Sequence, residues 1–117
     1  MPELLGITDD RRGTTLVVRV TGDVDLASSA TLERHLTDVV TTAHPPEPLV
    51  LDLSAVGFLG SCGLSLLLRL HQAAESRGTH LRIVAGHRAV TRPVELLGLQ
   101  HTLRLHPTVE AALALTY

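Results

Sequence analysis

The chain has 117 residues, a length that suits one domain with one hydrophobic core, and 44% of its residues are hydrophobic against 19% charged. A net charge of −2 and an aromatic content of 2% exclude a surface built to neutralise phosphates or to stack bases, so nucleic acid is not an expected partner. One cysteine excludes an internal disulfide, and no apolar run reaches the roughly 20 residues that span a bilayer. We therefore expect one domain over residues 1–117, in the reducing cytoplasm and without membrane insertion.

The first third of the chain predicts a hairpin followed by a helix. Residues 14–22 (TTLVVRVTG) are β-branched and apolar between two glycines, which is typical of a buried strand. A weaker strand over 4–8 (LLGIT) is expected to pair with it across a turn at 9–13 (DDRRG). From 26 to 43 the period changes to that of a helix, and Asp25 stands where it can cap the first turn. The apolar positions at helical spacing are Leu32, Leu36, Val39, Val40 and Ala43.

A proline-rich break at 44–48 separates this helix from a short strand and a second helix. Residues 48–54 (PLVLDLS) carry apolar side chains on both faces, as a central strand does. Residues 61–77 are helical in period and nearly all apolar, and Gly78 provides the stop. Such a helix buries two of its sides, or buries one and offers the other to a partner. Its narrow polar stripe consists of Ser65, Arg69, Gln72 and Ser76.

The last third of the chain also alternates between predicted strands and predicted helices. Residues 79–85 predict a strand, and residues 87–99 predict a helix that is kinked or begins late at Pro93. A short strand follows at 101–106, and a helix over 107–115 closes the chain. The order ββαβαβαβα indicates an α/β domain whose sheet is mostly parallel and begins with an antiparallel hairpin.

The junction FLGSCGL at 58–64 lies between an apolar strand and an apolar helix, and it matches no common catalytic motif. A nucleophile elbow, G-x-S-x-G, would need glycine where Leu59 stands, and a phosphate-binding loop would need a lysine, of which the chain has none. The seven histidines include no H-x-x-x-H pair, and one cysteine cannot supply a structural zinc site. We therefore expect no catalytic residues, no metal and no cofactor.

Two compatible interpretations remain for Ser61. Its hydroxyl can cap the first turn of the helix that follows. The same place suits a phosphate, because the free N–H groups and the dipole of a helix start favour negative charge. Gly60 and Gly63 are expected to let the strand turn into the helix with little bulk beside the serine. Phe58 and Leu59 are expected to anchor the turn in the core.

Three blocks of sequence carry a resemblance to a known family. They are VTGDVDLASSATLERHL at 20–36, LVLDLSAVGFLGSCGLSLLL at 49–68 and VTRPVELLGLQHTLRLHPTVEAALAL at 90–115. In combination they resemble a STAS domain of the anti-sigma factor antagonist type. The resemblance implies a single STAS-type domain with a four- or five-stranded mixed sheet, about four helices and no enzymatic activity. It also implies a partner, an anti-sigma factor with a histidine-kinase-like ATPase fold, which the antagonist binds so that a sigma factor is released.

Ser61 matches the serine that the partner kinase phosphorylates in this family, which switches the antagonist off. The family pattern is D-S-S/T-G, and this chain reads Gly60-Ser61-Cys62-Gly63, without the acid and the second hydroxyl. The resemblance also places the G-D-V-D turn (residues 22–25) beside the loop that carries Ser61 (residues 58–63, the serine loop). The implied partner-binding residues are Asp23, Asp25, Gly60, Ser61, Cys62 and Gly63.

Two further questions stay open at this point. A STAS protein without a phosphorylation switch can serve as an adaptor subunit of another complex, such as an ABC-type lipid transporter, and this is the alternative function. Cys62 is either an inert buried hydrophobe or a redox-sensitive thiol activated by the first turn of its helix. The chain is expected to be a monomer or a weak dimer.

Overall fold

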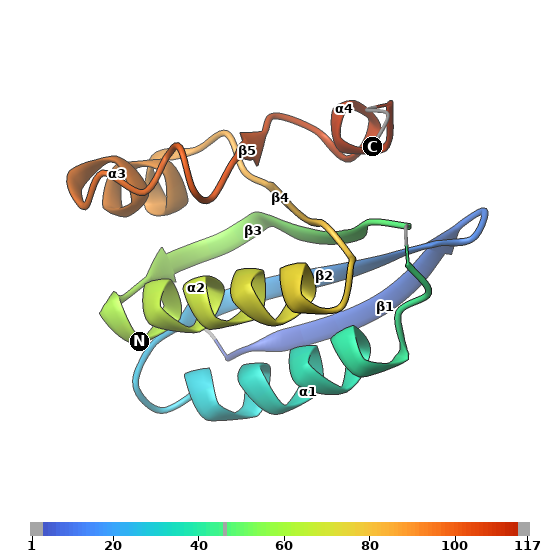
Figure 1. Ribbon diagram of the computed structural model, residues 1–117. Coiled ribbons are helices and arrows are strands. Elements are labelled where there is room, and N and C mark those ends of the chain that lie inside the picture. The colour runs from blue at the N-terminus through green and yellow to red at the C-terminus, as the bar shows by residue number, and fades with distance from the viewer. Residues whose placement is uncertain (1–3, 46, 115–117) are drawn as a thin grey trace.

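Within residues 4–45 and 47–114, which the computed structural model describes, five strands form one mixed sheet in the order β1-β2-β3-β4-β5 (Figure 1). The strands are β1 (Gly6–Arg12), β2 (Thr15–Val24), β3 (Leu49–Leu59), β4 (Leu81–Val84) and β5 (Leu105–His106). The hairpin β1–β2 is antiparallel, and the other pairs are parallel. The helices of the same residues are α1 (Ser29–Thr42), α2 (Ser61–Ser76), α3 (Arg88–Leu96) and α4 (Val109–Ala114). The predicted order and the mixed sheet are confirmed.

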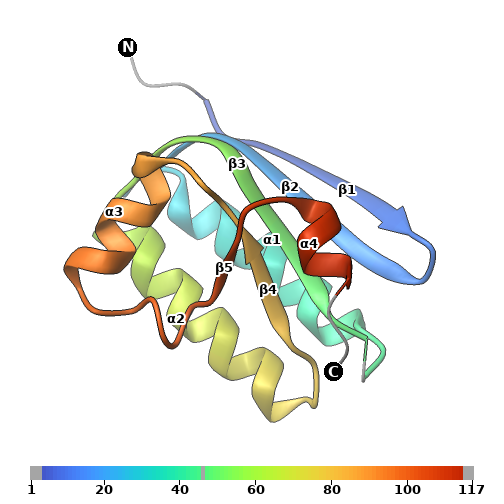
Figure 2. The same cartoon turned by 90° about the horizontal axis from the view of Figure 1, so that it is seen from above.

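The two faces of the sheet are covered unequally. Helices α1 and α2 pack side by side on one face, and the short α4 lies on the other (Figures 1 and 2). Helix α3 packs against the C-terminal part of β3, where His87 Nε2 lies 2.6 Å from the carbonyl oxygen of Val56. No helix of the described residues is long and apolar enough to cross a membrane.

The main core lies between the sheet and the pair α1–α2 and is almost entirely aliphatic. Its largest fully buried side chains are Leu32, Leu36, Leu49, Leu51, Leu53, Leu66, Leu67, Ile83, Leu103, Val18, Val20 and Val24. A smaller cluster under α4 contains Val17, Val50, Val84 and Ala112. The central strands β2 and β3 are thus apolar on both faces, which is why their sequences read as nearly continuous hydrophobic runs. Helix α2 packs against both α1 and the sheet, and the four residues of its polar stripe are exposed.

The first hairpin and the first helix differ from their predicted bounds. Strand β1 continues through the residues expected to form the turn, and Gly13 makes the turn with a φ of +64° that other residues rarely adopt. Helix α1 begins at Ser29 rather than at residue 26, because residues 26–28 form a separate turn before it.

The later elements differ in extent as well. Strand β3 runs on to Leu59, well beyond residue 54, because its parallel pairing with β2 continues to the end of that strand. Helix α3 begins at Arg88 and carries Pro93 inside it, so the predicted late start at the proline is wrong. Strand β5 is confined to the last two residues of the stretch expected to form it. The end of the predicted last helix, residue 115, lies outside the described residues.

Candidate functional site

Ser61 stands at the start of α2, directly after β3, and is exposed. The N-cap of this helix is Gly60, and no side chain caps it. The prediction that the Ser61 hydroxyl caps the helix is therefore wrong, because Ser61 is one residue too far along the chain to do so. Gly60 has φ −84° and ψ −179°, an extended conformation open to any residue. The backbone here does not need a glycine.

The end of β2 lies against this serine loop. The Gly60 N–H donates to the carbonyl oxygen of Val24 over 3.0 Å, and Asp23 stands opposite Phe58 in the strand register. The Asp23 Oδ1 atom would lie 3.3 Å from a Cβ atom added to Gly57. The structure thus brings the G-D-V-D turn next to Ser61.

Asp25 organises the turn that leads from β2 into α1. Its Oδ1 atom accepts hydrogen bonds from the N–H groups of Ala27 and Ser28, both at 3.0 Å, and lies 3.1 Å from Ser28 Oγ. The Asp25 N–H donates to Ser28 Oγ over 3.0 Å, and that oxygen lies 2.8 Å from the carbonyl oxygen of Asp23. Asp25 therefore caps the turn that precedes α1 rather than the helix itself, whose N-cap is Ser28.

Gly63 is buried where α2 begins to pack on the sheet. A Cβ atom at this position would lie 2.5 Å from Leu59 Cδ1 and 3.0 Å from Val24 Cγ1. The glycine is needed for space rather than for backbone freedom, because the start of the helix touches the ends of both central strands. Sequence analysis expected Gly63 to help the strand turn into the helix, whereas the structure requires a residue without a Cβ atom for the packing of the helix on the sheet.

Phe58 is half exposed, whereas its neighbour Leu59 is buried. The register between β2 and β3 shifts between Gly22 and Asp23, which leaves Gly57 as an extra residue on β3. Such a β-bulge turns the side chains beyond it to the opposite face. The prediction that both residues anchor the turn in the core is therefore right for Leu59 and wrong for Phe58.

Cys62 follows Ser61 and is half buried. Among the described residues it is a free thiol. Its predicted sensitivity to oxidation stays a prediction.

An ion pair joins α1 to α2, farther along both helices from the serine loop. Arg69 donates from Nε and Nη2 to the two carboxylate oxygens of Glu33, at 2.7 and 2.8 Å. The hydrogen bond from Arg69 lowers the pKa of the Glu33 carboxyl, and the carboxylate raises the pKa of Arg69. Sequence analysis placed Arg69 in the narrow polar stripe of its helix and did not find this partner, because the two residues belong to different helices.

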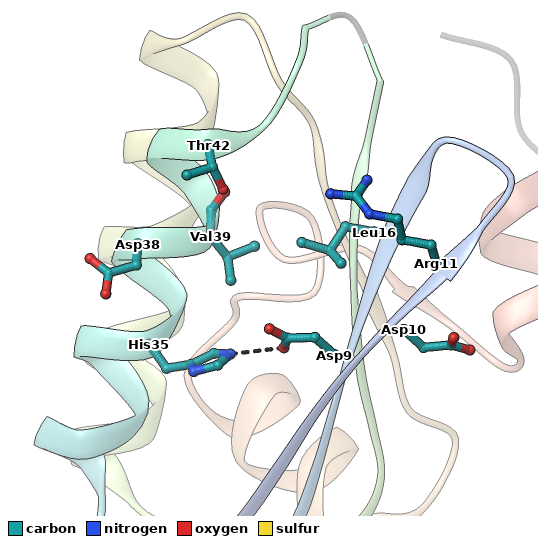
Figure 3. Close-up of a pocket in the computed structure, with 8 residues that line it drawn as sticks. All are labelled: Asp9, Asp10, Arg11, Leu16, His35, Asp38, Val39 and Thr42. Atoms are coloured by element: carbon teal, nitrogen blue, oxygen red, sulfur yellow. Dashed lines mark hydrogen bonds and ion pairs between the residues drawn. The ribbon is translucent and has the colours of Figure 1, made fainter.

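A groove of about 510 Å³ opens between β1 and the C-terminal half of α1 (Figure 3). His35 Nε2 lies 2.8 Å from Asp9 Oδ1 across it, while Asp10 points away from His35. Its lining is largely polar, and Asp38 adds a further carboxylate. Among the described residues no group of three or more His, Cys, Asp or Glu side chains is placed to hold a metal ion. Sequence analysis did not predict this groove, because residues 9 and 10 belonged to the expected turn.

Comparison with known proteins places this geometry in a family. Residues 7–112 match the model of the STAS domain. The anti-sigma-F factor antagonists RsfB and RsfA of Mycobacterium tuberculosis (strain ATCC 25618 / H37Rv) are 36% and 30% identical over 112 residues, which is 96% of this chain and 89% and 88% of theirs. The crystal structure of an anti-sigma factor antagonist from Mycobacterium paratuberculosis superposes with a TM-score of 0.88 at 35% identity, covering 97% of this chain and 94% of the other. The chain therefore belongs to the STAS domain family and, within it, to the anti-sigma factor antagonists.

Proposed function

We propose that this protein is a cytoplasmic switch that binds an anti-sigma factor, releases the sigma factor held by it, and is turned off when Ser61 is phosphorylated. It acts by binding and not by catalysis. The partner is an anti-sigma factor with a histidine-kinase-like ATPase domain, which also supplies the phosphoryl group from ATP. The partner surface consists of the serine loop and of the end of β2 with the turn into α1 (residues 22–28, the β2–α1 turn). Its residues are Asp23, Asp25, Gly60, Ser61, Cys62 and Gly63.

The exposure of Ser61 at the first position of α2 is the observation that carries the proposal. The first N–H groups of a helix lack carbonyl partners within it, and the first such bond in α2 is made only by Leu64, to Gly60. A phosphate at this place is compatible with the helix dipole, so modification leaves the fold intact.

The same modification changes the surface that a partner meets. A phosphoserine adds roughly −1.5 to −2 charges at pH 7. The β2–α1 turn beside it already carries two carboxylates, Asp23 and Asp25, which are both partly exposed. The phosphate adds bulk at this place and raises the desolvation cost of docking a partner whose surface fits the unmodified site.

Phosphoryl transfer and binding to a purified anti-sigma factor of the kinase type test this proposal together. We expect ATP to label the wild-type protein and Ser61→Ala to remain unlabelled while it binds the anti-sigma factor with or without ATP. Ser61→Asp should bind more weakly. Ser65→Ala is the matched control, because Ser65 is exposed one turn later on the same helix and should be labelled and released like wild type. Labelling of Ser61→Ala at the wild-type level would exclude Ser61 as the acceptor.

The alternative function, a STAS adaptor without a switch, has one observation in its favour. Gly60 and Cys62 replace the acid and the second hydroxyl of the family pattern around the acceptor serine. If the wild-type protein binds its partner tightly but takes up no phosphate from ATP under any condition, the adaptor function replaces the switch.

A further inference from the structure

Phe58 is an aromatic residue that the fold leaves on the surface at the proposed partner site. The chain has one phenylalanine and no tryptophan, and its core is built from leucine, valine and isoleucine. The Phe58 side chain is 50% exposed. Aromatic and arginine residues contribute most of the binding energy at protein interfaces, since they present a large rigid surface. Such a residue, half exposed beside the serine loop, suits a contact with another protein.

Two irregularities of the sheet precede Phe58 in β3. Leu49, Leu51 and Leu53 face the main core, a first register shift between Arg19 and Thr21 of β2 brings Val56 to the same face, and regular alternation from Val56 would bury Phe58. Gly57 is the unpaired residue of the bulge between Val56 and Phe58, so the alternation reverses and Leu59 enters the core instead. Bulges occur preferentially next to functional sites, where they redirect a side chain.

Gly60 leaves room for the ring at its exposed position. A Cβ atom on Gly60 would lie 3.2 Å from Cε2 and 3.5 Å from Cζ of Phe58, so the ring occupies the space beside the glycine. The ring and Ser61 therefore flank the same glycine.

The residues around the ring define the kind of partner that fits it. Leu26 is 81% exposed and lies in the turn after Val24, the residue that accepts the hydrogen bond from Gly60. Asp23 and Asp25, which flank Val24, give this surface an acidic character. A complementary partner has an apolar pocket bordered by basic side chains.

We propose that Phe58 is the apolar anchor of the complex with the anti-sigma factor, inserted in such a pocket. This inference rests on the proposed function and names the residue that contributes most to the affinity for the partner.

The test uses the purified anti-sigma factors of the host organism that have a histidine-kinase-like domain, and it measures the dissociation constant of this protein for each of them. ADP replaces ATP, so that no phosphoryl transfer occurs. For the factor that wild type binds most tightly, Phe58→Ala should raise the dissociation constant on the order of 30-fold, as expected for an aromatic anchor. Phe58→Leu, which keeps an apolar side chain, should recover most of the affinity. Leu96→Ala, at an exposed leucine of α3, is the control and should bind like wild type.

The outcomes separate this inference from the function on which it rests. If Phe58→Ala binds within about twofold of wild type while Ser61→Asp is released, the switch stands and the anchor is refuted. If Leu96→Ala loses as much affinity as Phe58→Ala, the anchor is refuted as well. If wild type binds none of the factors, both proposals fail. Thermal melts check that each variant is folded, and Phe58→Gln, which keeps the length of the side chain, replaces Phe58→Ala if that variant unfolds.

Discussion

The backbone N–H of Gly60 donates to the carbonyl oxygen of Val24 over 3.0 Å, and this bond fastens the start of α2 to the end of β2. The strand register continues the connection, because Leu59 stands opposite Val24. The serine loop and the β2–α1 turn are thus held together through the main chain. Side-chain substitutions on either segment can change the surface without separating the two.

We predict that Gly63→Ala destabilises the protein by about 1–3 kcal/mol, as overpacking does in a close-packed core. The added methyl group would lie 2.5 Å from Leu59 Cδ1, and neither Leu59 nor Val24 has free space to move into. Gly60→Ala is the matched comparison: its nearest contact is the exposed ring of Phe58, at 3.2 Å, the Val24 carbonyl oxygen lies at an ordinary 3.7 Å, and the change should cost less than about 1 kcal/mol. Urea unfolding of the two variants measures the difference. Equal losses would show that the space around Gly63 is not tight.

Asp25→Ala should lower the free energy of unfolding by about 1 kcal/mol, since it removes the acceptor of the N–H groups of Ala27 and Ser28. Asp25→Asn keeps an oxygen acceptor and should cost less. Asp38→Ala, at an exposed carboxylate of α1, is the control and should be close to neutral. An unchanged unfolding midpoint in Asp25→Ala would contradict a structural role for this carboxylate.

The pair Glu33–Arg69 predicts a pH-dependent contribution to stability. The pKa of Glu33 in the folded protein is below its ordinary value because of the hydrogen bond from Arg69. The contribution is therefore present above the unfolded pKa of about 4.3 and is lost as the pH falls through the lower folded value. Glu33→Gln should have a slightly lower melting temperature than wild type at pH 7. This difference in melting temperature should disappear in strong acid and become smaller in 1 M salt. Glu95→Gln, on α3, is the control and should show no comparable pH-dependent difference in melting temperature from wild type. A difference for Glu33→Gln that persists in acid would indicate an effect of packing instead of the ion pair.

His106 predicts a pH dependence of the same sign in a higher pH range. Partial burial, together with the positive charges of Arg82 and Arg104, lowers the pKa of its imidazole. In the window below the unfolded pKa of about 6.5 and above the folded value, the unfolded chain binds more protons at this histidine than the native protein. This histidine therefore makes the native state lose stability as the pH falls through that window. His106→Gln should flatten the fall in unfolding free energy between pH 7.5 and pH 5, whereas His101→Gln, at an exposed site, should leave the slope unchanged. Identical slopes in wild type and His106→Gln would refute the effect.

The sequence by itself determined the order of the elements and the mixed sheet. Alternating periods of two and 3.6 residues are local properties that a reader can follow along the chain, and short connections between such elements leave few topologies. The aliphatic runs of β2 and β3 also identified the centre of the sheet, because a strand that is buried on both faces is apolar at nearly every position. The blocks around Ser61 also carried the family resemblance, which the comparisons confirmed.

The tertiary structure alone decided which way the side chains of the site point. Phe58 lies outside and Leu59 inside because the second of two register shifts in the pairing of β3 with β2 reverses the alternation after Val56, and this pairing joins segments about 35 residues apart. The bond from Arg69 to Glu33 likewise depends on how two helices pack on the sheet. Periodicity describes the neighbours of a residue along the chain, whereas register and helix packing are set by contacts between distant segments. The surface that we propose for the partner is therefore a product of the assembled sheet.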